Sequence, residues 1–99
     1  MKIFTLGIAV LALSLTNVAV AADAAAGKEK SAACVACHGE DGVATMPLTP
    51  SLNGQKEDYL VLSTKAYRDG ERNNDMMKMF VMDLTDADIE NLAAYYSGL

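Results

Sequence analysis

Two cysteines and one histidine stand close together at Cys34, Cys37 and His38 in this chain of 99 residues. The spacing Cys-x-x-Cys-His is typical of covalent haem attachment. Each thiol can form a thioether with the porphyrin, and the adjacent imidazole can bind the iron. Since the sequence contains no other cysteine or histidine, no group of the same kind competes for these roles. The motif predicts one haem c, attached through Cys34 and Cys37 and ligated by His38.

Three other interpretations of the motif fit the sequence less well. A structural zinc site needs four nitrogen or sulfur ligands, and the two cysteines and one histidine supply only three. A thioredoxin-like redox pair belongs with a βαβ pattern, and no segment here alternates with the period of a strand. A disulfide across so short a loop would constrain the unfolded chain little. Haem is therefore the favoured interpretation.

Methionine is the obvious second iron ligand, because the one histidine is already used. Five methionines follow the first residue: Met46, Met76, Met77, Met79 and Met82. Met77 begins an apolar stripe that continues with Phe80, Val81 and Leu84, at the spacing of one helix face. Met76 lies one residue off that stripe. The pattern favours Met77 as the ligand and leaves Met76 as the second candidate.

The elements that must position these residues are predicted to be helical. We expect one helix over residues 23–36, an irregular loop over residues 38–55 with glycine and proline throughout, and a helix from Lys56 to Gly70. Asn73, Asn74 and Asp75 offer a cap before the apolar stretch 76–84. Thr85 and Asp88 resemble a capping box, and the helix that follows has a regular apolar stripe. The fold class is all-α.

The start of the chain differs from the rest. Lys2 precedes an apolar stretch from Ile3 to Ala22 that ends in small residues, which is typical of a secretory signal peptide. A membrane anchor is the alternative, although the strongest apolar block is short for one. We expect residues 1–22 to be cleaved and residues 23–99 to form a single haem domain in the periplasm. No stable membrane insertion is expected after cleavage.

Removing 22 of the 99 residues leaves 77, a size at which apolar burial alone seldom stabilises a domain. Haem would supply the missing buried surface. The loss of Lys2 leaves seven basic against 13 acidic residues, so the formal charge changes from −5 to −6. This charge disfavours binding to nucleic acid, because no basic patch is present to meet the phosphates. It favours redox partner proteins with a basic docking patch.

Taken in order, the motifs resemble those of small bacterial class I c-type cytochromes, above all a single-haem unit of the cytochrome c4 type. The resemblance covers essentially the whole chain after residue 22. It rests on Ala26-Gly27-Lys28, Cys34 to Gly39 with Asp41-Gly42, Pro50 to Gln55, Tyr59-Leu60, Arg68-x-Gly70-x-Arg72 and Leu84 to Tyr96.

This resemblance implies about four helices around one covalent haem. It also implies Met77 as the iron ligand, and a hydrogen bond from the second ring nitrogen of His38 to the carbonyl of Pro50. Gly27 matches the position where the first helix crosses the last, near Tyr95.

The function that these features imply is a periplasmic electron carrier, which is not an enzyme. Iron bound by both histidine and methionine has no vacant position for a substrate. One alternative is a haem subunit of a larger periplasmic dehydrogenase, for which the motifs would be the same. A second alternative is a haem sensor or peroxidase-like site with a labile methionine.

Overall fold

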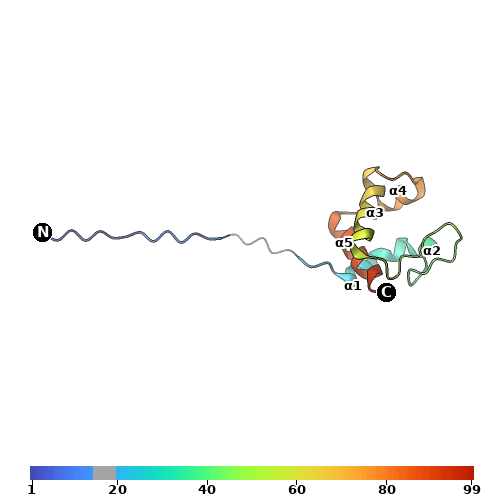
Figure 1. The fold of residues 1–99 in the computed structure, drawn as a ribbon, viewed down its shortest axis with the longest axis horizontal. Coiled ribbons are helices and arrows are strands. Elements are labelled where there is room, and N and C mark those ends of the chain that lie inside the picture. Colours follow the sequence, from blue (N-terminus) through green and yellow to red (C-terminus); the bar gives the residue numbers. More distant parts are fainter. Residues whose placement is uncertain (15–19) are drawn as a thin grey trace.

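The computed structural model describes residues 1–14 and 20–99, and these contain helices but no strand. In chain order the elements are α1 (Ala24–Lys30), the 3-10 helix η1 (Ser31–Ala33), α2 (Val35–His38), α3 (Glu57–Asp69), α4 (Asp75–Val81) and α5 (Asp86–Ser97). Figure 1 shows these elements gathered into one helical body. The all-α prediction is confirmed. No helix within the described ranges is long and apolar enough to cross a membrane.

Residues 1–14 and 20–22 form no helix and are exposed. Residues 15–19, which belong to the predicted signal peptide, lie outside the described residues. The helical body begins at Asp23, whose carboxylate accepts hydrogen bonds from the backbone N–H groups of Ala25 and Ala26. This side-chain cap satisfies donors that the first turn of a helix leaves free.

The single helix predicted over residues 23–36 is wrong, because the segment divides into α1, η1 and α2. Ser31 lies at the division, and its hydroxyl donates to the carbonyl oxygen of Lys28 at 2.6 Å. Such local side-chain bonds compete with regular helix geometry. The N–H of Cys34 then donates to the carbonyl of Ser31, three residues back, which tightens the turn. The division raises the number of α-helices among the described residues to five, where about four were expected.

Residues 39–56 form the irregular loop that the sequence predicted, with turns but no helix. It is closed on itself, because the carbonyl of Gly42 accepts hydrogen bonds from the N–H groups of Leu52 and Asn53. Its far end is tied to α5 by a 2.9 Å bond from the N–H of Gly54 to the carbonyl of Tyr96. The loop is thereby held as an ordered part of the domain.

The capping box predicted at the start of α5 is present. The hydroxyl of Thr85 accepts from the N–H of Asp88 at 3.1 Å, and the Asp88 carboxylate accepts from the N–H of Thr85 at 3.0 Å. The bond from the N–H of Thr85 lowers the pKa of Asp88, as do the Thr85 hydroxyl and the ammonium of Lys30, which lies 3.7 Å from the carboxylate. The folded helix start therefore favours the ionised form of Asp88.

Helices α1 and α5 cross at Gly27. A Cβ atom placed there would lie 2.0 Å from the carbonyl oxygen of Asn91, so only glycine permits the observed approach. The crossing point lies at Asn91 and Leu92, one turn before the Tyr95 position that the family resemblance implied. The side-chain oxygen of Asn91 also accepts a hydrogen bond from the N–H of Asp23, which ties the start of α1 to the middle of α5.

The apolar core is small. Leu60 from α3 packs with Leu92, Ala93 and Tyr96 from α5, and Cys34 packs against this cluster. Helix α4 packs mainly on α3, and its buried residue is Val81. A core of this size leaves space at the centre of the domain, and that space is the candidate site.

The crossing of α1 and α5 gives a test of the fold. Gly27→Ala should lower the unfolding free energy by about 2 kcal/mol, because overpacking forces the two backbones apart. For a domain of this size that corresponds to a fall of roughly 10 °C in Tm. Thermal unfolding followed by circular dichroism measures it.

Gly98→Ala is the matched control, because a Cβ at Gly98 would meet its nearest atom at an ordinary 3.5 Å. Equal Tm values for the two variants would contradict the close approach at Gly27.

The contribution of the capping box to stability can be tested by varying the pH. The lowered pKa of Asp88 means that its contribution is present above the ordinary aspartate pKa of about 3.9 and is lost as the pH falls through the folded-state value. At pH 6 the variant Asp88→Asn should be less stable than the parent by about 0.5 kcal/mol. Urea unfolding should show this difference shrinking towards zero below about pH 3.5. A difference that is constant with pH would exclude the ionised carboxylate as its cause.

Candidate functional site

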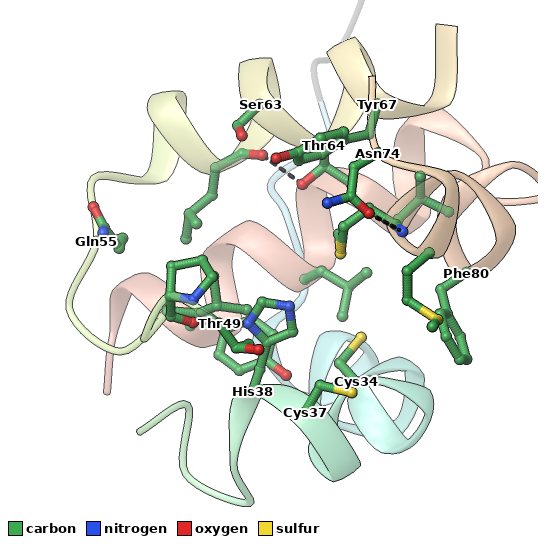
Figure 2. Close-up of a pocket in the computed structure, with 18 of the residues that line it drawn as sticks. Cys34, Cys37, His38, Thr49, Gln55, Ser63, Thr64, Tyr67, Asn74 and Phe80 are labelled. Atoms are coloured by element: carbon green, nitrogen blue, oxygen red, sulfur yellow. Dashed lines mark hydrogen bonds between the residues drawn. The ribbon is translucent and has the colours of Figure 1, made fainter. Parts of the chain in front are cut away.

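The groups of the Cys-x-x-Cys-His motif lie on one wall of a cavity (Figure 2). Cys34 caps α2, and Cys37 and His38 occupy the last two positions of that helix. Residues separated by three and four positions share a helix face, so the fold directs both thiols and the imidazole to the same side. The short helix α2 therefore brings the two thiols and the imidazole together.

The imidazole of His38 is held in one orientation. Its Nδ1 lies 2.8 Å from the carbonyl oxygen of Pro50, and the side chain is 6% exposed. Because a carbonyl oxygen can only accept, Nδ1 carries the proton and Nε2 keeps its lone pair. The structure thus contains the hydrogen bond that the family resemblance implied, and it leaves Nε2 available to a metal ion. Such a contact orients a ligating histidine and raises its basicity.

The two thiols are not joined to each other, and both are half-buried. Burial raises the pKa of the Cys34 thiol, with a smaller contribution in the same direction from Cys37. A raised pKa disfavours the thiolate that metal binding and disulfide exchange require. The Cys34 thiol is therefore held in its neutral form in the folded chain.

The cavity has a volume of about 460 Å³, within the range of small-molecule and cofactor sites. The wall across from His38 is formed by α3 and the start of α4, where Figure 2 places Thr64, Tyr67 and Asn74. Apolar side chains supply much of the lining: Leu52, Leu60, Val81, Leu84, Leu92 and Ala93. The cavity therefore lies between α2 and the pair formed by α3 and α4.

The methionines separate into two groups around this cavity. Met79 and Met82 are exposed and do not line it, whereas Met46, Met76 and Met77 do. Met76 is 57% exposed, while Met77 is half-buried, as the apolar stripe through Met77 predicted. The thioether of Met77 is therefore the better shielded of the two candidates.

The start of α4 is fixed beside Met77. The predicted cap is present, because the side-chain oxygen of Asn74 accepts a hydrogen bond from the N–H of Met77 at 3.0 Å. Figure 2 shows this bond on the wall across from His38. The cap therefore places the backbone of Met77 at the cavity rather than leaving it to a frayed helix end.

The sequence did not single out a polar cluster on the same wall. The guanidinium of Arg72 stacks over the ring of Tyr67 at 4.4 Å and donates to the hydroxyl of Ser63 at 2.6 Å. Among the described lining residues Arg72 alone carries a permanent charge, which favours an anionic group at this part of the wall. The spacing of Ser63 and Tyr67, four residues apart on one helix, was the available signal.

One buried polar atom is not satisfied by the described residues. The hydroxyl of Tyr96 faces the cavity region between Ser31 and Cys34 without a hydrogen-bond partner, and burial raises the pKa of Tyr96 to about 12. An unpaired buried hydroxyl costs free energy, so it indicates that something is missing beside it. The site also offers an apolar cavity, two thiols that are not joined to each other and the free Nε2 of His38. These features together fit a large, flat, mostly apolar group attached at Cys34 and Cys37.

Comparison with known proteins agrees with this donor set. The family model described as cytochrome c oxidase, cbb3-type, subunit III matches residues 21–95. The chain is 51% identical over 81 residues to cytochrome c-554(548) of Halomonas halodenitrificans, covering 79% of this chain and 98% of that protein. It is 44% identical over 89 residues to cytochrome c4 of Pseudomonas aeruginosa, covering 89% of this chain but 44% of that protein.

A solved structure shows the same fold. Cytochrome c4 of Acidithiobacillus ferrooxidans superposes with a TM-score of 0.75 at 32% identity, over 80% of this chain and 51% of that one. The chain therefore spans nearly the full length of one relative and about half the length of the two cytochromes c4.

Proposed function

The chain belongs to the c-type cytochrome family that includes cytochrome c4, and on that basis we propose that it carries single electrons in the periplasm through a haem held by Cys34, Cys37, His38 and Met77. The family identifies it as an electron-transfer protein with covalent haem c, not as an enzyme. The proposal concerns the residues that hold the haem, the compartment in which the chain works and the kind of partner that it meets.

One observation carries the residue assignment. Both thiols and the free Nε2 of His38 meet on one wall of a single apolar cavity, and the half-buried thioether of Met77 belongs to the opposite wall. A planar group linked to Cys34 and Cys37 would have an imidazole on one face and a thioether on the other. Met76 also lines the cavity, and its greater exposure is the reason for placing it second.

The haem iron, when bound, takes up and releases one electron. The protein contributes orientation, shielding and tuning. The carbonyl of Pro50 fixes the direction of His38, and the thioether of Met77 would hold the iron as a second ligand and would raise the reduction potential. The buried side chains of Leu60, Leu92 and Val81 exclude water from the cavity.

Electrons are proposed to pass at the open rim of the cavity. Five large hydrophobic residues line the cavity and are also exposed: Met46, Leu48, Tyr59, Met76 and Phe80. An apolar rim allows close, short-lived contact with a partner, while the net negative charge of the chain draws a partner with a basic patch by long-range attraction.

The periplasm is proposed because residues 1–22 have the pattern of a cleaved signal peptide. Supporting this, the described residues before Asp23 are exposed and contribute nothing to the core, so their removal would leave the helical body intact. Mass spectrometry of protein exported from a bacterial host tests the cleavage, and retention of Lys2 in the exported form would contradict it.

The ligand assignment is tested by two matched substitutions. Met77→Leu, which nearly conserves side-chain volume, should convert the ferric haem to a high-spin form and remove the methionine-to-iron charge-transfer band. Met76→Leu should leave that band unchanged. The visible spectrum of each purified ferric protein measures both effects. Loss of the band in Met76→Leu alone would assign the ligand to Met76.

The proposed partner chemistry is tested by ionic strength. Reduction by a cationic ruthenium ammine complex should slow as salt is added, whereas oxidation by ferricyanide should become faster, because salt screens attraction in the first case and repulsion in the second. Stopped-flow measurements at several salt concentrations give both rates. The reverse pattern would contradict docking to a basic partner.

Two further measurements distinguish the alternatives that the sequence left open. A free carrier should elute as a small monomer from gel filtration of a native extract, whereas a dehydrogenase subunit should elute within a larger complex. Rapid and complete binding of carbon monoxide to the reduced protein would favour the sensor or peroxidase-like interpretation.

A further inference from the structure

Helix α4 is weakly anchored by apolar packing, although it carries the candidate ligand. Its exposed apolar residues are Met76, Met79 and Phe80, and Met82 just after it is exposed as well. Val81, at 4% exposure, is its single buried side chain. Segments with few buried apolar contacts open more easily than the rest of a domain. Something other than the core must therefore keep residues 75–84 against the cavity.

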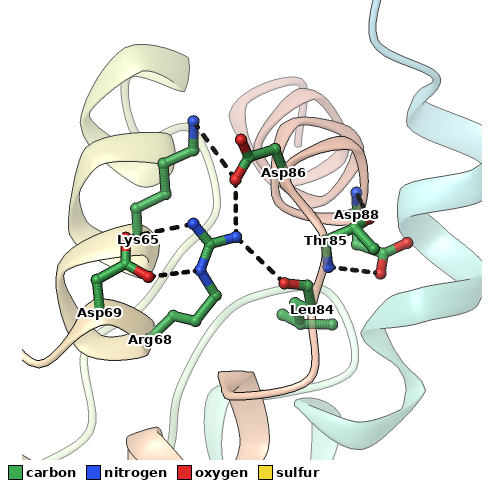
Figure 3. Close-up of polar contacts among 7 residues, drawn as sticks. All are labelled: Lys65, Arg68, Asp69, Leu84, Thr85, Asp86 and Asp88. Carbon is green, nitrogen blue, oxygen red and sulfur yellow. Dashed lines mark hydrogen bonds and ion pairs between the residues drawn. The ribbon is translucent and has the colours of Figure 1, made fainter.

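A cluster of polar contacts lies where this segment ends (Figure 3). The guanidinium of Arg68 donates through Nη1 to the carbonyl oxygen of Leu84 at 3.2 Å and to the carboxylate of Asp86 at 2.7 Å. Its Nε donates to Asp69 at 2.8 Å, which fixes the plane of the group. The Arg68 side chain is 19% exposed and its bond to the carbonyl of Leu84 is partly buried, whereas the carboxylates of Asp69 and Asp86 are 49% and 65% exposed.

The backbone of Arg68 contacts the same segment nearer its start. The ammonium of Lys78, one residue after Met77, donates a hydrogen bond to the carbonyl oxygen of Arg68. One residue at the end of α3 is therefore bonded to the segment both beside Met77 and at Leu84. The side chain of Leu84 lines the cavity, so the second of these contacts also fixes part of the cavity wall.

We propose that Arg68 is a positioning residue that holds the segment from Asp75 to Leu84 against the cavity and so keeps the methionine on the iron. This inference rests on the proposed function, because it requires Met77 as an axial ligand. Arginine suits the role because its planar group directs several N–H donors at once to Leu84, Asp69 and Asp86. A lysine ammonium cannot reproduce that geometry.

A structural role alone would have a different signature. If Arg68 only joined α3 to α5, its loss would lower the stability of the whole domain and leave the methionine bond unchanged until unfolding. If it positions the segment, its loss should free the sixth position of the iron in protein that is still folded. Binding of imidazole to the ferric protein reports on that position, because imidazole must displace the methionine.

The test compares Arg68→Lys with the parent, both loaded with haem. Arg68→Lys should bind imidazole at least about tenfold more tightly, since the loss of one charge-assisted hydrogen bond is enough for a factor of that size. Its charge-transfer band should also disappear on heating well below the temperature at which the helical circular dichroism is lost. Asp86→Asn, which removes the negative charge of the acceptor at 2.7 Å but keeps Arg68, should shift imidazole binding in the same direction.

Gly27→Ala is the control for global stability, because it acts at the α1–α5 crossing far along the chain from α4. It should lower Tm without changing the affinity for imidazole. Parental imidazole affinity in both Arg68→Lys and Asp86→Asn would overturn the inference, as would an equal gain in Gly27→Ala. A parent protein without the charge-transfer band would instead show that the methionine assignment itself is wrong.

Discussion

The domain has a cavity where a small protein ordinarily has its core. A cavity of about 460 Å³ separates α2 from α3 and α4, and four side chains from α3 and α5 form the buried cluster beside it. A chain of this size has little apolar burial to spare. The haem of the family is therefore a structural component as well as the redox centre. The irregular loop, the broken first helix and the exposed α4 all lie around it and are difficult to explain without it.

Part of this arrangement was predictable because it depends on residues close together in sequence. The Cys-x-x-Cys-His motif on a single short helix needs no distant contact to bring its three groups together. The capping box of Thr85 and Asp88, the cap at Asn74 and the stripe through Met77 are likewise set within one or two helical turns. For such features local spacing already determines which side chains share a face.

The rest depended on contacts between distant segments. The direction that α2 takes after the division at Ser31 is visible only in the tertiary structure, and helix propensity cannot indicate it. The unpaired hydroxyl of Tyr96 and the stacking of Arg72 on Tyr67 exist only after the helices have packed. Arg68 appeared in the sequence as part of a family motif, and its partners on α4 and α5 could not be identified without the fold. Long-range geometry, rather than residue type, was the missing information.

The bond between His38 and Pro50 has a consequence for how this domain can vary. Surface loops ordinarily tolerate added residues at little entropic cost. Here the loop runs from the imidazole itself to the carbonyl that orients it, across 12 residues, and its middle is pinned at Gly42. An insertion anywhere in that ring would rotate or release the imidazole. A change in loop length, harmless in most loops, would here change the surroundings of the iron ligand His38. The loop therefore forms part of the redox centre, and its residues Met46, Leu48 and Leu52 also line the cavity.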